Sequence, residues 1–119
     1  MKKIYHLSTC STCKRILKEL KVDDNFDLQD IKTNPLTENQ LEELKDLAGS
    51  YEALFSKLAQ LYKSKGLKDQ TLSEGDYKSL ILEHYTFLKR PVMVFGEQIF
   101  IGNSPKTVEA AKAYLRTNE

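Results

Sequence analysis

The segment HLSTCSTCKRILKEL, residues 6–20, constrains the fold of this chain more than any other part of its sequence. The run just before it, Lys3 to Leu7, is short and rich in β-branched and aromatic side chains, which is typical of a buried strand. From Ser11 onward the apolar residues change to the spacing of one helix face: Cys13, Ile16, Leu17 and Leu20. Two cysteines therefore mark the junction between a strand and a helix.

The middle of the chain is predicted to form about three helices. Thr37 and Gln40 make a capping box, and Gly49 ends the helix that follows them. The predicted buried stripe of this helix is Leu41, Leu44 and Leu47. Ser50 and Ser73 are placed to cap two further helices, and the second continues toward Pro91. One face of the helix after Ser50 would carry Leu54, Leu58, Leu61 and Tyr62.

Strands are expected on both sides of this helical segment. FDLQDIK, residues 26–32, alternates like a strand. PVMVFGEQIFIGN, residues 91–103, is typical of a hairpin, with two apolar runs joined by a Gly-Glu pair that favours a type II′ turn. The Ser-Pro pair at 104–105 then provides a cap and a first-position proline for a terminal helix.

The predicted element order is β-α-β, a helical insertion, then β-β-α. A β-α-β unit requires a parallel strand pair, whereas the closing hairpin is antiparallel. Together with Cys-x-x-Cys at the first strand-to-helix junction, this order predicts an α/β thioredoxin-like fold with a mixed four-stranded sheet. We expect one domain over 1–119, with thioredoxin-like parts at about 1–36 and 87–119 and the insertion at about 37–86.

The two cysteines have different predicted surroundings. Cys10 lies at or just before the helix amino terminus, where free backbone N–H groups and the helix dipole favour a thiolate. Cys13 lies on the apolar face one turn further, so it should be buried and less reactive. Dithiol chemistry needs such a pair, because the first sulfur attacks and the second resolves the mixed disulfide.

Basic side chains flank the cysteines. Lys14 and Arg15 occupy the first helical turn, where cations oppose the helix dipole but favour a thiolate or a bound oxyanion. The alternative is that both simply project into water. His6 lies shortly before Cys10 and is a candidate to influence the thiolate, either as His⁺ or as a proton acceptor. Its alternative is a structural role in the strand.

A zinc site is a weaker explanation of the cysteines. His6 and His84 would have to complete a tetrahedral set with Cys10 and Cys13, but the chain has no second Cys-x-x-Cys and no paired histidine motif. We therefore expect no metal. With only two cysteines, a disulfide scaffold is excluded.

Charge and hydropathy limit the compartment and the partners. The net charge of +1 gives no electrostatic reason to bind nucleic acid or an anionic membrane. No apolar run reaches the ~18 residues of a spanning helix. The amino-terminal stretch is a poor signal peptide because His6 and Ser8 interrupt its apolar run. We expect a cytoplasmic monomer in which disulfides are transient or catalytic.

The ordered segments IYHLSTCSTCKR, PLT, LYKSKGLKD and FLKRPV…IFIGN resemble the arsenate reductase-related (ArsC/Spx/YffB) family over residues 3 to about 108. The resemblance implies a thioredoxin-like fold with a helical insertion. It also implies that Pro91 is a cis proline whose loop lies against the cysteine motif, and that Arg90 reaches toward Cys10. A trans proline at a strand start and a solvated arginine are the alternatives.

Residue by residue, the resemblance assigns the reductase nucleophile to Cys10, the histidine before it to His6 and the arginine of the RPV motif to Arg90. The two other oxyanion arginines of the reductases are replaced, the first by Ser56 and the second by Asn103. This loss weakens the case for arsenate itself as the substrate. The candidate binding residues are Ser11, Thr12, Lys14, Arg15, Lys57, Pro91 and Asn103.

Three functions remain open at this point. The first is a thiol–disulfide oxidoreductase of the arsenate reductase type, with Cys10 as nucleophile and Cys13 as resolving cysteine. Glutathione, a glutaredoxin or a thioredoxin would then supply electrons, with no bound cofactor. The second, implied by the Spx resemblance, is a redox-sensing regulator that binds the carboxy-terminal domain of the RNA polymerase α subunit. The third is a relative without redox turnover whose cysteines serve packing or metal binding.

Overall fold

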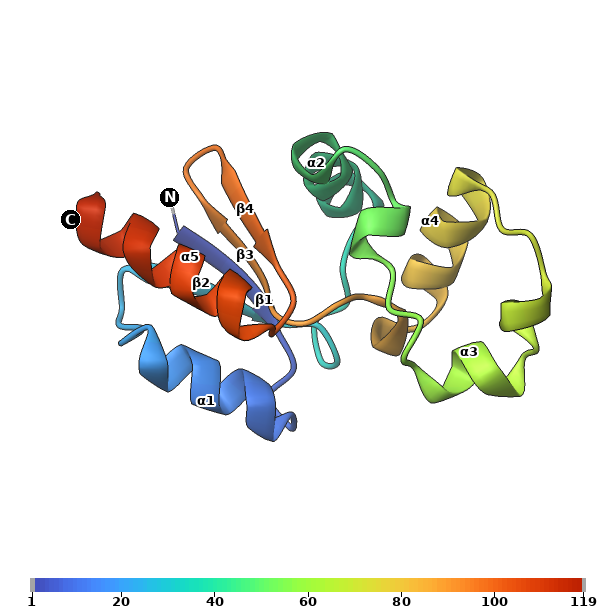
Figure 1. Cartoon of the computed structure of the whole chain (residues 1–119), viewed down its shortest axis with the longest axis horizontal. Coiled ribbons are helices and arrows are strands. Elements are labelled where there is room, and N and C mark those ends of the chain that lie inside the picture. Colours follow the sequence, from blue (N-terminus) through green and yellow to red (C-terminus); the bar gives the residue numbers. More distant parts are fainter. Residues whose placement is uncertain (1, 119) are drawn as a thin grey trace. The chain divides into compact units, whose positions relative to one another are not determined.

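The computed structural model describes residues 2–118 and contains, within them, one mixed four-stranded sheet (Figure 1). Its strands are β1 (Lys2–His6), β2 (Phe26–Asp30), β3 (Val92–Phe95) and β4 (Gln98–Ile101). They are arranged in the order β2-β1-β3-β4. β1 and β2 are parallel, whereas β3 is antiparallel to both β1 and β4. The predicted parallel pair and the predicted hairpin are therefore confirmed.

The described residues also form α-helices and short 3₁₀ turns. The helices are α1 (Ser11–Glu19), α2 (Glu38–Ala48), α3 (Gln60–Ser64), α4 (Glu74–Glu83) and α5 (Pro105–Thr117). The 3₁₀ turns are η1 (Glu52–Leu54), η2 (Leu67–Asp69) and η3 (Tyr85–Phe87). Within the described residues, one compact unit comprises residues 2–34 and 90–118, and a second comprises Pro35–Lys89. That both units act as one domain stays a prediction.

The core of the first unit lies between one face of the sheet and the helices α1 and α5 (Figure 1). Both helices contribute apolar residues one turn apart, as the periodicity of their sequences predicts. The buried members of this core are Ile4, Ile16, Leu20, Met93, Phe95, Val108 and Ala111. Because α1 is held along its whole apolar face, its amino terminus has a defined place at the end of β1.

The second unit has an aromatic centre. Phe55 is 1% exposed and stacks on Phe87 at 5.3 Å between ring centroids. Tyr77 from α4 lies 4.8 Å from the same Phe55 ring. The extended backbone at Phe55 also forms an antiparallel bridge with Leu88. These contacts join the segment after α2 to the segment after α4.

Several details of the predicted helical segment are wrong. Leu47 is 39% exposed rather than buried. The residues after Ser50 form η1 and then the separate short helix α3, so Leu58 is 90% exposed instead of sharing a helix face. α4 ends at Glu83, because His84 is extended and its side chain accepts a hydrogen bond from the backbone of η3. The tertiary bridge at Phe55 interrupts the helical pattern.

The capping box of α2 provides a stability prediction. Thr37 Oγ1 accepts from Gln40 N at 3.1 Å, and Gln40 Oε1 accepts from Thr37 N at 3.1 Å. Thr37→Ala removes one of these bonds, so we expect the free energy of unfolding to fall by about 1 kcal/mol. Urea denaturation measures this loss. Thr71→Ala, at an exposed position outside the helices, is the control. An equal effect in both variants would argue against the cap.

Candidate functional site

One end of the sheet brings together most of the predicted site residues. The strands β1, β2 and β4 end there and β3 begins there, since β3 runs opposite to its two neighbours. The helices α1 and α5 also begin at this end. The carbonyl of Pro91 accepts from Gly102 N at 2.9 Å, which joins the start of β3 to the end of β4. The residues at this end are His6, Cys10, Arg90, Pro91 and Asn103.

Cys10 is the N-cap residue of α1. Its backbone is extended, with φ −88° and ψ 117°. Its N–H donates to the carbonyl of Leu7 at 3.0 Å, and its own carbonyl accepts from Lys14 N at 3.1 Å. The side chain is half-buried and makes no capping hydrogen bond to the helix backbone. The sulfur thus lies at the amino end of α1, as the sequence predicts.

The surroundings of Cys10 favour its thiolate. Burial raises the pKa of the Cys10 thiol, but hydrogen bonds from the backbone and side chain of Cys13 and from the backbone of Thr12 lower it. The positive charge of Arg90 acts in the same direction. The net result is a pKa below the ordinary cysteine value. A larger fraction of Cys10 is therefore ionised near neutral pH than of a free cysteine.

Cys13 has the opposite character. Its side chain is 1% exposed. Burial, together with the negative charge of the Cys10 thiolate, raises the pKa of Cys13 to about 11, although the backbone of Leu7 and the charge of Arg90 oppose this shift. The pair is therefore asymmetric: one accessible sulfur ionises readily, and its neighbour stays protonated. Both are free thiols.

Arg90 and Pro91 directly precede β3 at this end of the sheet. The peptide bond between them is cis, which confirms the geometry that the family resemblance implies. Pro91 is buried and Arg90 is half-buried. The charge of Arg90 lowers the pKa of both Cys10 and Cys13, so the guanidinium is close enough to act on both sulfurs. The alternatives of a trans proline and a fully solvated arginine are wrong.

His6 lies at the end of β1, opposite Asp30 of β2 in the parallel register. Burial lowers the pKa of His6, and the nearby charge of Asp30 opposes this only in part. The imidazole is therefore neutral near pH 7, since an ordinary histidine already titrates near pH 6.5. This state suits a proton acceptor rather than the His⁺ alternative.

Sequence reasoning missed two residues next to the site, Ser8 and Asp30. Both the N–H and the hydroxyl of Ser8 donate to the carboxylate of Asp30. The carboxylate also accepts from Lys32 N at 3.1 Å. The sequence did contain a signal for Asp30: it is an acidic residue at the end of a strand predicted to be parallel to the strand before Cys10. The carboxyl ends of parallel strands meet at one edge of a sheet.

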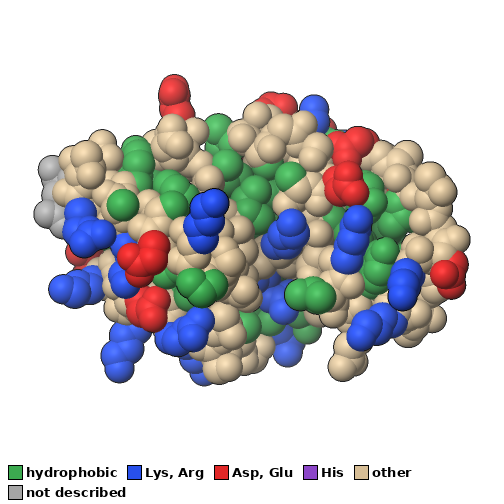
Figure 2. Space-filling view, in the orientation of Figure 1, with side chains coloured by type: hydrophobic (Ala, Val, Ile, Leu, Met, Phe, Trp, Pro, Cys, Tyr) green, Lys and Arg blue, Asp and Glu red, His purple; other side chains and the backbone are tan. Residues whose placement is uncertain are grey.

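The remaining candidates have different positions. Ser11, Lys14 and Arg15 are exposed on the first turns of α1, and basic side chains appear along the edge of the first unit where α1 lies (Figure 2). Asn103 is exposed just before Ser104, the N-cap of α5.

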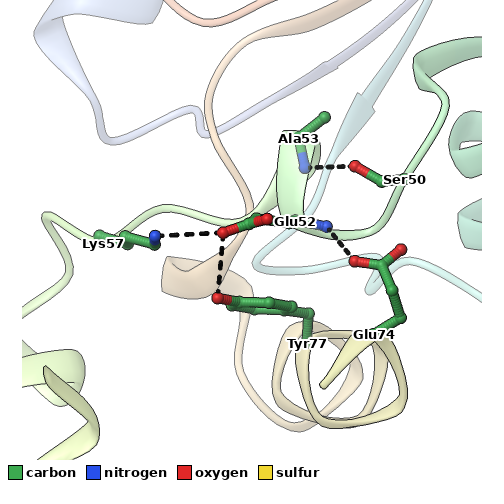
Figure 3. A network of polar contacts seen from close by, with 6 residues as sticks. All are labelled: Ser50, Glu52, Ala53, Lys57, Glu74 and Tyr77. Carbon is green, nitrogen blue, oxygen red and sulfur yellow. Dashed lines mark hydrogen bonds and ion pairs between the residues drawn. The ribbon is translucent and has the colours of Figure 1, made fainter. Parts of the chain in front are cut away.

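Lys57 belongs to the second unit, outside the sheet. Its Nζ forms an ion pair with Glu52 at 3.3 Å (Figure 3). The same Glu52 carboxylate accepts from Tyr77 Oη at 3.2 Å. Glu74 accepts from the backbone N–H groups of Tyr51 and Glu52 at 2.7 and 3.1 Å. In the structure, Lys57 is therefore part of a network that joins η1 to α4.

Neither a metal centre nor a membrane-spanning element emerges from the described residues. Across residues 2–118, no group of three or more His, Cys, Asp or Glu side chains is arranged to hold a metal ion. His84 Nδ1 lies 2.7 Å from Thr86 Oγ1, so this histidine has a structural role as a hydrogen-bond partner of η3. Within the same range, no helix has the length and apolar character needed to cross a bilayer.

Comparisons with known proteins agree with this architecture. A model of the ArsC family matches residues 5–111 of the chain. An arsenate reductase of Haemophilus influenzae is 29% identical over 111 residues, covering 88% of this chain and 93% of that protein. An arsenate reductase of Yersinia enterocolitica is 27% identical over 93 residues, covering 76% of this chain and 66% of that protein, about two thirds of its length.

A regulator and a solved structure are also similar. The global transcriptional regulator Spx 2 of Bacillus anthracis is 25% identical over 104 residues, covering 83% of this chain and 77% of that protein. The structure of an arsenate reductase from Vibrio cholerae matches with a TM-score of 0.75 at 25% identity, covering 92% of this chain and 95% of that one. These similarities confirm the predicted α/β thioredoxin-like fold.

Proposed function

Since the chain belongs to the ArsC family, we propose that it is a thiol–disulfide oxidoreductase in which Cys10 is the nucleophile and Cys13 the resolving cysteine. The observation that carries this proposal is the asymmetry of the pair. Cys10 is accessible at the amino end of α1 with a lowered pKa, whereas Cys13 is buried with a pKa of about 11. Such a pair suits sequential attack and resolution.

The proposed reaction has two exchange steps. The Cys10 thiolate attacks one sulfur of a disulfide substrate, forms a mixed disulfide and releases the other sulfur as a thiolate. Cys13 then loses its proton and attacks Cys10 Sγ, which forms the Cys10–Cys13 disulfide and releases the second thiolate. Once Cys10 is in the mixed disulfide, its negative charge no longer raises the pKa of Cys13. Resolution therefore becomes easier after the first step.

Other residues at this end of the sheet have supporting roles in the proposal. Arg90 and the backbone N–H groups of Thr12 and Cys13 stabilise the Cys10 thiolate or an anionic substrate group. The neutral His6 accepts a proton during turnover. Asn103, where the reductases have an arginine, makes arsenate a poor substrate. The candidate cations for anion binding at this end of the sheet are Lys14 and Arg15.

The electron donor restores the dithiol without a bound cofactor. Two electrons from a pair of glutathione molecules, or from the dithiol of a glutaredoxin or thioredoxin, reduce the Cys10–Cys13 disulfide by the reverse exchange. A small thiol or redox protein is thus the proposed partner. We also propose that the protein is a cytoplasmic monomer.

A thiol titration tests the proposed function. We measure the alkylation rate of each cysteine from pH 5 to 11 and quantify Cys10 and Cys13 separately by peptide mass spectrometry. Because the pKa of Cys10 is lowered and that of Cys13 is about 11, Cys10 should reach its half-maximal rate at the lower pH. Cys13 should not be alkylated at neutral pH. Titration of Cys13 at a lower pH than Cys10 would contradict the assignment of roles.

The charges of α1 should influence substrate choice. Lys14→Gln with Arg15→Gln is expected to slow reaction with anionic oxidised glutathione about two- to fivefold and to speed reaction with cationic cystamine, because exposed charges steer ligands modestly. Initial rates at low and high salt measure the effect. Lys112→Gln on α5, a cation already paired with Glu109 at 3.2 Å, is the control. Equal changes for both substrates would rule out a charge effect.

The similarity to Spx 2 supports a second candidate function. In this alternative, a Cys10–Cys13 disulfide changes a protein interface, and the partner is the carboxy-terminal domain of the RNA polymerase α subunit. Pull-down of that domain by the reduced and the oxidised protein separates the two proposals. Retention that depends on oxidation supports the regulator. No retention in either state counts against it.

A further inference from the structure

The turn that leads into α1 is held by hydrogen bonds to a residue of another strand. It runs from Leu7 to Cys10 and is closed by the 3.0 Å hydrogen bond from Cys10 N to Leu7 O. Ser8, the second residue of this turn, donates twice to Asp30: its N–H lies 3.4 Å from Oδ1, and its hydroxyl binds Oδ2. Asp30 is 22 residues further along the chain. A single carboxylate therefore fixes both the backbone and the side chain of the residue two positions before Cys10.

Asp30 is itself well placed to act as a support. It is the last residue of β2 and pairs with His6 in the parallel register. The 2.9 Å bond from Ile31 N to His6 O and the 3.1 Å bond from Lys32 N to Asp30 Oδ1 hold the chain on either side of the carboxylate. The end of β2 is thus anchored to β1, and the turn is anchored to the end of β2.

We propose that Asp30 is a positioning residue for the reactive thiol: by holding Ser8, its carboxylate keeps the Leu7–Cys10 turn in the shape that places Cys10 Sγ at the amino end of α1. This inference rests on the proposed thiol chemistry of Cys10. Asp30 acts through Ser8 and the turn, not on the substrate. The hydrogen bonds from Ser8 and Lys32 also lower the pKa of Asp30, so the carboxylate stays ionised and able to accept them.

The sign of the effect separates positioning from simple charge. A carboxylate near a thiolate disfavours the thiolate by repulsion, so removing only its charge would lower the pKa of Cys10. Removing its hydrogen bonds to Ser8 would instead displace Cys10 from the N–H groups of α1 and raise the pKa of Cys10. Asp30→Asn keeps hydrogen-bonding atoms at both positions, whereas Asp30→Ala loses them.

The experiment measures the pH profile of Cys10 alkylation in matched variants of the full chain. In Asp30→Ala we expect the pKa of Cys10 to rise by about one unit and the alkylation rate at pH 7 to fall about five- to tenfold. Ser8→Ala removes one of the two bonds and should slow the reaction about two- to threefold, while Ser8→Thr should restore it. Asp30→Asn should leave the pKa unchanged or slightly lower.

The control is Asp27→Asn, which removes another carboxylate of β2. Asp27 pairs with Lys3 at 3.0 Å on the exposed part of the strand. The Asp27→Asn variant should leave the pH profile of Cys10 alkylation unchanged. Circular dichroism confirms that each variant is folded, and Ser8→Ala tests the inference if Asp30→Ala does not fold.

Two results would overturn the inference. In the first, Cys10 of the wild type has a lowered pKa, but its pH profile of alkylation is unchanged in both Asp30→Ala and Ser8→Ala. This result contradicts the positioning role and leaves the proposed function intact. A wild-type Cys10 that titrates like a free cysteine contradicts the proposed function, and the positioning role with it.

Discussion

Cys10→Ser is expected to abolish thiol–disulfide exchange, with a loss of turnover of at least about a thousandfold. A serine hydroxyl at the amino end of α1 stays protonated where the thiol ionises, because the same hydrogen bonds and the charge of Arg90 cannot bring its pKa near neutrality. Turnover of a small disulfide, coupled to oxidation of a reduced donor, measures the loss.

Cys13→Ser is the matched control for this prediction. Without a resolving sulfur, Cys10 should still attack, so one equivalent of product thiolate appears and the mixed disulfide accumulates. Intact mass spectrometry detects that adduct on Cys10. Sustained turnover in Cys10→Ser, or an adduct found on the buried Cys13 when Cys10 is present, would refute the assignment of the nucleophile.

Phe95→Ala is expected to cost about 3–5 kcal/mol of unfolding free energy, the largest loss of stability predicted for a single side chain of the first unit. Phe95 is fully buried in the core between the sheet, α1 and α5. Its ring contacts Phe26, Phe100 and Tyr114 at centroid distances of 6.0, 5.7 and 6.2 Å. Alanine would leave a cavity bordered by three aromatic rings.

Equilibrium unfolding in urea, followed by circular dichroism, measures this loss. Leu28→Ala is the control, since Leu28 is also on the sheet but is 42% exposed, and it should cost far less. A decrease below about 1 kcal/mol for Phe95→Ala would mean that the core rearranges to fill the space. Because α1 packs on the same core, this variant should also reduce the reactivity of Cys10.

Part of the site was predictable because it depends on local spacing. Two residues between Cys10 and Cys13 are enough to place one sulfur at a helix start and the other on the buried face, and the structure has both there. Capping boxes at Thr37 and Ser73 and the turn at Gly96, with its φ of 63°, are equally local and are confirmed. Each depends on hydrogen bonds or dihedral angles within a few residues.

Sequence spacing by itself therefore determined the order of the elements and the unequal surroundings of the two sulfurs. Only the tertiary structure decided which distant groups support them. It joins Ser8 to Asp30 across two strands. It also brings the charge of Arg90, which the family resemblance but no local spacing predicted, to a pair of thiols some eighty residues earlier. It also ends α4 at Glu83 and leaves Leu58 exposed. The physical reason is that these outcomes depend on strand pairing and side-chain packing between remote segments, whose free energy no local periodicity encodes.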